Sequence, residues 1–274
     1  MHKAVLTIDV EDWFCVRNFQ NSIGFEQWEG CEQRVSNGMD FVLRELKSRN
    51  IQATFFVLGW IAEKHPEVVR AIAEDGHEIE SHGYSHRAIE ELTPAELCVE
   101  IQRSRILIEA ITGKKVRGFR APSFSITHDT LWALDVLKEN GIQYDSSIYP
   151  VRHPNYGIPE FGEEVQDVGG LIEVPMTTFR GIPISGGGFF RLYPYAVSQN
   201  LLKRVLKKRH AILYFHPWEF DEEQPRVSSI SAFASFRHYT GLRKNREKFT
   251  RLLNDFEFVP MGGLLSQKGF VLSG

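Results

Sequence analysis

Residues 51–86 read IQATFFVLGWIAEKHPEVVRAIAEDGHEIESHGYSH and alternate between two apolar patterns. Residues 51–58 are rich in β-branched and aromatic side chains, which predicts a buried strand. Pro66 opens a segment whose apolar side chains have helical spacing, and Gly76 ends it. A second strand-like segment follows at residues 77–80. This stretch therefore predicts a strand–helix–strand unit, the building block of a parallel sheet covered by helices.

The same alternation continues on both sides of this unit. It predicts strands at residues 4–8, 116–119, 171–174 and 211–215, and helices at residues 32–50, 94–113, 127–140, 194–209 and 239–256. Thr93-Pro94-Ala95-Glu96 is a capping box, so one helix is expected to start there. Residues 149–191 are richer in proline and glycine, which predicts long loops or an antiparallel insertion. We expect one α/β domain whose parallel sheet is open or closed into a barrel.

The composition is that of a globular chain able to build a full core, since 42% of the 274 residues are hydrophobic and 24% are charged. The formal net charge of −3 argues against a nucleic-acid partner, which would usually leave a basic stripe. The basic run at residues 203–209 is interpreted as the exposed face and last turn of a helix.

The cysteines Cys15, Cys31 and Cys98 are scattered and form no CxxC pair, so we expect neither a disulfide framework nor a zinc knuckle. The apolar run that follows Lys3 is too short for a signal peptide. No stretch approaches the roughly 18 uncharged apolar residues of a membrane helix. These features predict a cytoplasmic protein without an integral membrane segment.

Functional side chains of barrels and open α/β sheets collect at the carboxyl ends of the strands, and four predicted strand ends carry unusual polar groups. The first is TIDVEDW at residues 7–13, with Asp9, Glu11 and Asp12. Bunched acids repel one another unless a cation or a partner offsets their charge. Strand alternation places Asp9 and Glu11 on one side of the chain. A solvated acidic turn or a helix cap is the alternative interpretation.

The second strand end carries His82 and His86. Two imidazoles four residues apart converge on one ion if the segment makes a helical turn. Joined to one carboxylate of the acid cluster, they would form a two-His-one-carboxylate set with open positions for water and substrate. Surface histidines at a chance spacing are the alternative, because an isolated HxxxH is weak evidence.

The third and fourth strand ends carry Arg120 and His216. An arginine in this position can pair with a carboxylate and hold it ionised and oriented, or make an ordinary salt bridge at a barrel rim. A histidine directly after an apolar strand is often a hydrogen-bonded core residue. Beside a metal, however, its pKa near working pH suits a general acid.

Taken in this order, the four segments resemble the motifs of the polysaccharide deacetylase family, also called the NodB-homology domain or carbohydrate esterase family 4. The resemblance extends from about Ala4 to His216 and is closest at ATFFVLGW (residues 53–60) and GHEIESHGYSH (residues 76–86). It implies a distorted (β/α)7 barrel in one catalytic domain over residues 1–274, with a C-terminal extension at about residues 217–274. The later segments resemble a branch associated with bacterial exopolysaccharide gene clusters: GGGFFR (186–191), HPWEFD (216–221), QPR (224–226) and the final His238-Tyr239 helix.

The resemblance also implies roles for single residues. Asp9 would be the general base, as the first acid of a TFDD-like motif, and Arg120 would hold it. His216 would be the general acid. A looser match makes Asp145, in YDSS at residues 144–147, the acid that orients the catalytic histidine.

His82 and His86 would bind the metal. The carboxylate ligand departs from the family pattern, because Val10 follows Asp9 where the family has adjacent aspartates. Strand alternation favours Glu11 as the third ligand, and Asp12 remains the alternative.

The implied activity is metal-dependent removal of N-acetyl groups from an acetamido sugar of a glycan or glycan precursor. Whether that substrate is lipid-linked, oligomeric or small stays open. One divalent ion is expected, zinc first, with cobalt or nickel as alternatives. Trp13 and Trp218 are expected to line a sugar groove, and a backbone N–H near Ser123 to stabilise the oxyanion. Two other functions stay open: an allantoinase-like cyclic-amide hydrolase of the same fold, and an inactive relative that binds glycan.

Overall fold

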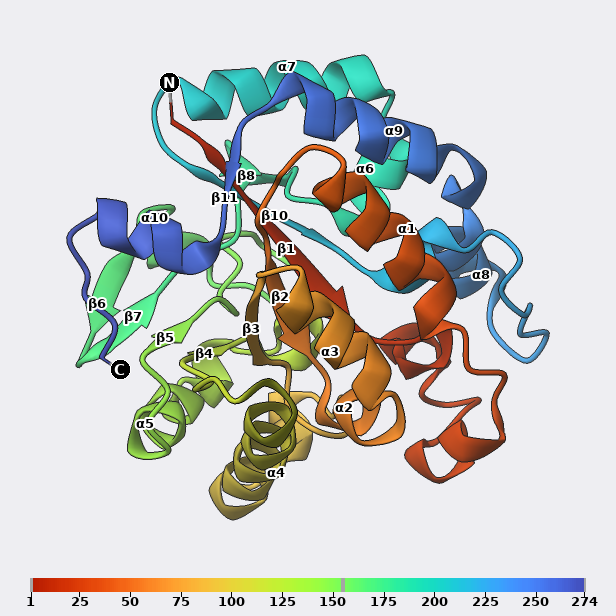
Figure 1. Cartoon of the computed structure of the whole chain (residues 1–274), viewed down its shortest axis with the longest axis horizontal. Coiled ribbons are helices and arrows are strands. Elements are labelled where there is room, and N and C mark those ends of the chain that lie inside the picture. The colour runs from red at the N-terminus through yellow and green to blue at the C-terminus, as the bar shows by residue number, and fades with distance from the viewer. Residues whose placement is uncertain (1, 154–155, 274) are drawn as a thin grey trace.

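The computed structural model describes residues 2–153 and 156–273. Its centre is a curled sheet in the strand order β10-β1-β2-β3-β4-β5-β7-β6, with β11 paired to β1 (Figure 1). The expected α/β class and parallel sheet are confirmed, and the curled sheet forms a half-barrel. Its parallel strands are β1 (Ala4–Val10), β2 (Thr54–Val57), β3 (Glu78–Ser81), β4 (Gly118–Phe119), β5 (Tyr144–Asp145), β7 (Leu171–Glu173), β10 (Ala211–Phe215) and β11 (Phe258–Val259).

The insertion expected between residues 149 and 191 contains the antiparallel pairing. β6 (Gln166–Val168) pairs with β7, and β8 (Thr178–Phe179) pairs with β9 (Ile182–Pro183) in a separate sheet. Helices cover the outside of the curled sheet (Figure 1). They are α1 (Val35–Lys47), α2 (Gly59–Lys64), α3 (Pro66–Glu74), α4 (Pro94–Thr112), α5 (Trp132–Glu139), α6 (Gly187–Leu192), α7 (Tyr195–Leu206), α8 (Ala232–Tyr239), α9 (Leu242–Asp255) and α10 (Met261–Gln267).

Short 3-10 helices connect these elements: η1 (Trp13–Cys15), η2 (Arg17–Phe19), η3 (Phe25–Gly30), η4 (Ile89–Glu91), η5 (Pro122–Phe124), η6 (His128–Thr130), η7 (Pro159–Phe161) and η8 (Pro217–Phe220). The capping box at the start of α4 is confirmed, since Thr93 and Glu96 exchange hydrogen bonds. The basic run at residues 203–209 lies in the last turn of α7 and just after it, with exposed or partly exposed side chains.

Two expected helices differ from the prediction. The helix expected at residues 239–256 is α9, which begins only at Leu242, because Gly241 adopts a φ of 83° after α8 has ended at Tyr239. The helix expected at residues 127–140 begins as the 3-10 turn η6, and α5 starts only at Trp132. Thr130 Oγ1 accepts from Thr127 N–H at 2.8 Å and donates to the Ser125 carbonyl at 2.9 Å, which holds this tighter first turn.

Strand alternation creates two cores. Side chains on the outer face, such as Leu6 and Val57, pack beneath the helices. Side chains on the inner face, such as Phe56 and Tyr144, pack inside the curl. Each face is apolar, so the strands are buried on both sides.

α10 covers the amino-terminal ends of β2 and β3. Met261, Leu264 and Leu265 of α10 belong to the inner core. Met261 N–H donates to Thr54 Oγ1 at 2.7 Å, at the start of β2. Because α10 covers the amino-terminal end of the curled sheet, a polar functional site is expected at the opposite end, where the strands terminate.

The last part of the chain is integrated into the sheet, since β11 pairs with Ala4 and Val5 of β1. Among the described residues, no helix has both the length and the apolar character needed to cross a lipid bilayer. Cys15, Cys31 and Cys98 are free thiols.

Candidate active site

Three candidate metal ligands converge at the carboxyl ends of β1 and β3. Glu11 comes directly after β1, and His82 comes directly after β3. One ligand atom from each of Glu11, His82 and His86 lies within 4.8 Å of the others. His86 Nε2 is 2.6 Å from Glu11 Oε2. Parallel pairing of β1, β2 and β3 brings these distant sequence positions to one edge of the sheet.

The protonation state of this cluster suits a cation. Burial lowers the pKa of His82 to about 4, so its imidazole is neutral at pH 7. Its Nδ1 lies 2.8 Å from the Arg120 carbonyl, which only accepts, so Nδ1 carries the hydrogen and Nε2 keeps a lone pair. Glu11 Oε2 is buried beside His86 Nε2, and no backbone or hydroxyl group in the described part of the chain donates to it. Two imidazoles and one carboxylate are a ligand set that fits a divalent metal.

The histidine segment converges through a loop and not through a helical turn. Gly83 and His86 have φ values of 74° and 56°, which no helix contains. Glu100 on α4 accepts the backbone N–H groups of Tyr84 and Ser85, both at 2.8 Å. The expected helical turn is therefore wrong, and a carboxylate on α4 holds the loop that brings the imidazoles together.

Asp12 has a structural role in this arrangement. Its carboxylate accepts backbone N–H groups from Trp13 at 2.7 Å, Arg34 at 2.6 Å and Val35 at 2.9 Å. It thereby caps η1 and the start of α1, which is the helix-cap alternative considered for the acid cluster. Of the two candidates for the third metal ligand, Glu11 and not Asp12 is part of the cluster.

Asp9 is held by a fully buried arginine. Arg120 Nη1 donates to Asp9 Oδ1 at 2.7 Å, and both side chains are at most 3% exposed. Arg120 also donates to Thr7 Oγ1 at 2.6 Å and to the Ser146 carbonyl at 3.0 Å. These bonds fix the position of the guanidinium, and the guanidinium in turn orients the Asp9 carboxylate.

His216 follows β10 and lies beside the same acids. Its Nε2 is 3.6 Å from Glu11 Oε1 and 3.9 Å from Asp9 Oδ2. Burial lowers the pKa of His216, but the carboxylates of Glu11, Glu219 and Asp9 outweigh that effect and raise it to about 9. His216 is therefore protonated at neutral pH in this arrangement.

Glu219 is the acid that faces the other nitrogen of His216. Its Oε2 is 3.4 Å from His216 Nδ1, and Arg191 Nε donates to its Oε1 at 2.9 Å. The assignment of this role to Asp145 is wrong, because Asp145 accepts from the N–H and hydroxyl of Ser147 at 3.0 and 2.6 Å. Sequence reasoning missed Glu219 although the HPWE segment carried a signal. His216 is the N-cap of η8 and Glu219 is its third residue, which is the spacing of a capping box.

Asp145 instead pairs with Glu173, which lies opposite it on β7, and this pair predicts a pH-dependent stability. Burial raises the pKa of Glu173 well above its ordinary value of 4.5, and Asp145 adds to that rise. The folded protein thus holds a proton that the unfolded chain releases. The stability that this proton contributes is fully present below the ordinary pKa of Glu173. It is lost as pH rises through the raised pKa of the folded protein, by up to about 1.4 kcal/mol per pH unit.

Glu173→Gln keeps an acceptor for the Ile148 N–H, which Glu173 Oε1 binds at 3.0 Å, and removes the titrating proton. We expect its thermal midpoint to fall less between about pH 5 and pH 8 than that of the wild type. Differential scanning fluorimetry across this range measures both. Glu222→Gln, at an exposed acid, is the matched control and should follow the wild type. Parallel curves for Glu173→Gln and the wild type would contradict the prediction.

The aromatic residues expected to line a sugar groove have other contacts. Trp13 is 4% exposed and donates its indole N–H to the Glu32 carbonyl at 2.8 Å, so it belongs to the core. Trp218 stacks on His216 with ring centroids 5.1 Å apart, and donates to Glu11 Oε1 at 3.0 Å. Ser123 lies in η5, just beyond Arg120, with a φ of 57°. Trp218 thus contacts both the candidate acid and a candidate metal ligand.

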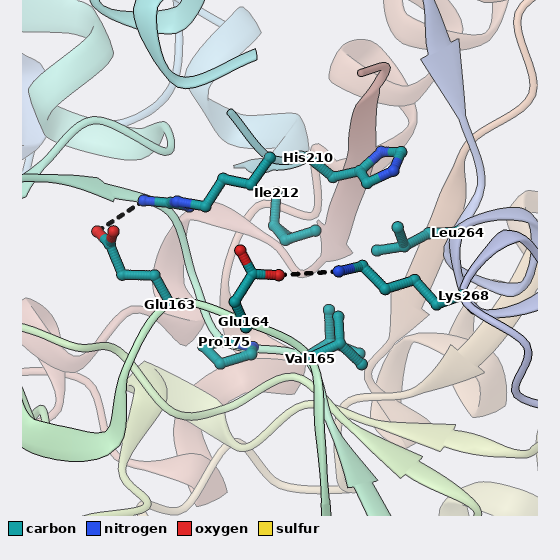
Figure 2. Close-up of a pocket in the computed structure, with 10 residues that line it drawn as sticks. Glu163, Glu164, Val165, Pro175, His210, Ile212, Leu264 and Lys268 are labelled. Carbon is teal, nitrogen blue, oxygen red and sulfur yellow. Dashed lines mark hydrogen bonds and ion pairs between the residues drawn. The ribbon is translucent and has the colours of Figure 1, made fainter. Parts of the chain in front are cut away.

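A pocket lies apart from this site (Figure 2). His210 lines it and precedes β10, whereas His216 follows β10, so the pocket and the site lie at opposite ends of that strand. Arg209 pairs with Glu163 at 2.6 Å, and Lys268 pairs with Glu164 at 2.8 Å. The acids of the pocket already have cationic partners, and we assign it no ligand.

Comparisons with known families divide the chain into two matched segments. Residues 30–144 match the family described as polysaccharide deacetylase, and residues 146–266 match a domain of unknown function, DUF3473. The first segment contains His82, His86 and Arg120, and the second contains His216 and Glu219. Both segments therefore contribute to the candidate site.

Curated relatives carry deacetylase names. A peptidoglycan-N-acetylglucosamine deacetylase of Bacillus cereus is 30% identical over 117 residues, which are 38% of this chain and 42% of that protein. A chitooligosaccharide deacetylase of Bradyrhizobium sp. is 34% identical over 97 residues, which are 35% of this chain and 42% of that protein. Each match spans less than half the length of the relative.

Solved structures share the fold. A candidate polysaccharide deacetylase of Mycobacterium smegmatis has a TM-score of 0.62 at 19% identity, covering 100% of this chain and 94% of that one. A carbohydrate esterase family 4 pseudoenzyme of Bacillus anthracis has a TM-score of 0.51 at 19% identity, covering 96% and 65%. Because a pseudoenzyme shares it, the fold alone does not specify activity.

Fold and site together define an α/β protein with polar chemistry at the carboxyl ends of its strands. Residues 30–144 of this chain match the polysaccharide deacetylase family, the family whose motifs the sequence resembles.

Proposed function

We propose that this chain hydrolyses the N-acetyl amide of an acetamido sugar in a glycan or glycan precursor, with one divalent metal ion as cofactor. The supporting observation is that three groups of side chains lie next to one another. They are a set of candidate metal ligands, a carboxylate held by an arginine, and an imidazole held by a carboxylate. Their members are Glu11, His82 and His86; Asp9 with Arg120; and His216 with Glu219. These are the parts that amide hydrolysis with acid–base assistance requires.

Glu11, His82 and His86 would hold the metal. Nitrogen and oxygen ligands of this kind suit zinc first, with cobalt and nickel as alternatives. A bound ion would polarise the acetyl carbonyl and lower the pKa of a water molecule towards about 7.

Asp9 is the proposed general base. Arg120 donates to its Oδ1 at 2.7 Å and orients the carboxylate, which leaves Oδ2 as the oxygen nearer to His216 Nε2. Oδ2 would accept the proton of the attacking water. A carboxylate fixed in this way loses little freedom when the reaction begins.

His216 is the proposed general acid. The departing amine must be protonated, because it cannot leave as an anion. Glu219 faces Nδ1 of His216, and Trp218 stacks on the ring, so that Nε2 is the nitrogen on the side of Asp9 and Glu11. This orientation lets Nε2 of the protonated ring donate its proton to the amine.

Trp218 is expected to position the metal ligand Glu11. Trp218→Phe keeps the stacked ring and removes the indole N–H that donates to Glu11 Oε1 at 3.0 Å. We expect zinc affinity to fall about ten-fold, as for other groups that orient metal ligands, with little change in thermal midpoint. Isothermal titration calorimetry measures the affinity. Trp13→Phe, which loses an indole hydrogen bond outside the cluster, is the matched control. Equal zinc affinity in both variants would contradict this role.

We further propose that residues 1–274 act as one catalytic unit. Both matched segments supply strands to the same sheet, and Asp9 of β1 lies beside His216 of the second segment. A lipid-linked or oligomeric substrate, a role in exopolysaccharide synthesis and a cytoplasmic location are predictions from the sequence.

The test is acetate release from a panel of acetamido sugars. We expect release from at least one member, loss of release with a chelator, and recovery with zinc, cobalt or nickel. Including allantoin in the panel separates the cyclic-amide hydrolase. Metal-loaded protein that binds acetamido sugars but releases no acetate from any of them would establish a binding protein instead.

A further inference from the structure

The outer face of α8 exposes two aromatic side chains. Phe233 and Phe236 are 69% and 54% exposed, and their spacing places them on one face of the eight-residue helix. The Arg237 guanidinium lies 5.8 Å from the Phe233 ring, so a cation shares this face. Single exposed apolar residues are common on proteins, whereas an adjacent aromatic pair indicates a contact surface.

The segment around these phenylalanines carries only positive charge. Residues 224–246 contain no Asp or Glu in a chain whose net charge is −3, and their cations are Arg226, Arg237, Arg243, Lys244 and Arg246. The Arg226 guanidinium lies 4.8 Å from the ring of Tyr239, the last residue of α8. Arg243 and Lys244 stand in the first turn of α9, directly after α8.

Four of these cations form no ion pair among the described residues. Arg226, Arg237, Arg243 and Lys244 are exposed. The ion pairs found among residues 2–153 and 156–273 involve none of the four. We call these four side chains together with Phe233 and Phe236 the α8 face.

The inner side of α8 packs on the candidate active site. His238 is 1% exposed and stacks on Trp218 with ring centroids 4.3 Å apart, and Trp218 in turn stacks on His216. β1 and β10 run toward the side of the molecule on which α8 lies (Figure 1). The α8 face therefore stands at the rim of the site, pointing away from the protein.

We propose that the α8 face docks the protein on an anionic lipid bilayer. Aromatic rings insert at the boundary between headgroups and acyl chains, and unpaired arginine and lysine side chains are attracted to anionic headgroups. Two phenylalanines are too small an apolar area for a stable protein dimer. A nucleic acid that wraps the chain would meet its net negative charge, whereas a flat bilayer contacts only this face.

Docking in this way would place the candidate active site next to the membrane surface. A glycan carried on a lipid would then reach Asp9 and His216 without leaving the bilayer. The docking itself involves no substrate, metal or catalytic residue. Its failure would therefore leave the proposed hydrolysis intact, and the reverse also holds.

The test is co-sedimentation of the full chain with vesicles of phosphatidylcholine alone or mixed with phosphatidylglycerol. We expect binding to the mixed vesicles that weakens with added salt. Phe233→Ser with Phe236→Ser should weaken it at least about ten-fold. Arg243→Gln with Lys244→Gln should weaken it about 30-fold, since each cation near an anionic surface contributes roughly five-fold. Circular dichroism and thermal midpoints check that each variant is folded.

Matched controls lie on other helices. Val99→Ser with Ile106→Ser removes side chains on α4 that are 62% and 69% exposed, and Lys203→Gln with Lys207→Gln removes charge from the end of α7. Both should bind mixed vesicles like the wild type. Three results would overturn the proposal: no preference for anionic vesicles, losses as large in the controls, or unchanged binding when both phenylalanines are replaced. Tight binding of a DNA or RNA oligomer, without vesicle binding, would overturn it in favour of nucleic acid.

Discussion

Replacing Asp9 by Asn is expected to lower kcat for acetate release by about 10²–10⁴, the usual contribution of one acid–base group. The amide cannot take the proton of the attacking water, yet it is almost isosteric with the carboxylate. Arg120 keeps its bonds to Thr7 and Ser146 in this variant, which limits the structural effect. Steady-state kinetics on an acetamido sugar that the wild type deacetylates, with metal content measured on the same sample, give the result.

Asp135→Asn is the matched control for this substitution. Asp135 lies on α5 with its side chain 76% exposed, far in the chain from the candidate site. It should retain the kcat of the wild type. If Asp9→Asn turned over substrate as fast as Asp135→Asn while folded and metal-loaded, Asp9 would not be the base.

The second large effect is expected for His82→Ala. The variant should lose the bound divalent ion, and acetate release should fall to background, because two remaining ligands hold zinc far more weakly than three. Zinc stoichiometry from elemental analysis after dialysis is the primary readout, and acetate release is the second. The stoichiometry is measured without turnover, so it reports on the metal site even if no substrate has been identified.

His128→Ala provides the comparison for the loss of an imidazole. Its ring is on η6, 56% exposed, and pairs with Glu160 at 2.6 Å, outside the cluster. Zinc stoichiometry should equal that of the wild type. A His82→Ala protein that still carries one tightly bound zinc would show that the ion is held elsewhere.

Local sequence patterns predicted most of the fold. The alternation of strand and helix patterns from residue 4 to residue 215 matches β1, β2, β3, β4, β7 and β10 and the helices α1, α3, α4, α5 and α7. Errors occurred where one residue's backbone angle decided the outcome, as at Gly241, whose left-handed conformation delays the start of the expected helix from residue 239 to Leu242. Hydrophobic periodicity contains no information about such angles.

For the candidate site, the sequence predicted which residues come together better than it predicted the role of each. Asp9, Glu11, His82, His86, Arg120 and His216 come together in the structure, as the strand-end argument expected. The roles of Asp12 and Asp145 were not separable by sequence, because a carboxylate that caps backbone N–H groups and one that binds a metal are the same residue type. Their partners, Arg34 and Ser147 among others, decide between them.

The sequence by itself determined which strands end in polar groups, since alternation and apolar runs are local properties of the chain. Only the tertiary structure decided which of those groups meet: Glu219 and not Asp145 faces His216, Glu11 and not Asp12 joins the histidines, and Trp218 contacts Glu11. The physical reason is that hydrogen bonds and ion pairs act over a few ångströms. Sheet curl and loop conformation set those distances for residues far apart in the chain.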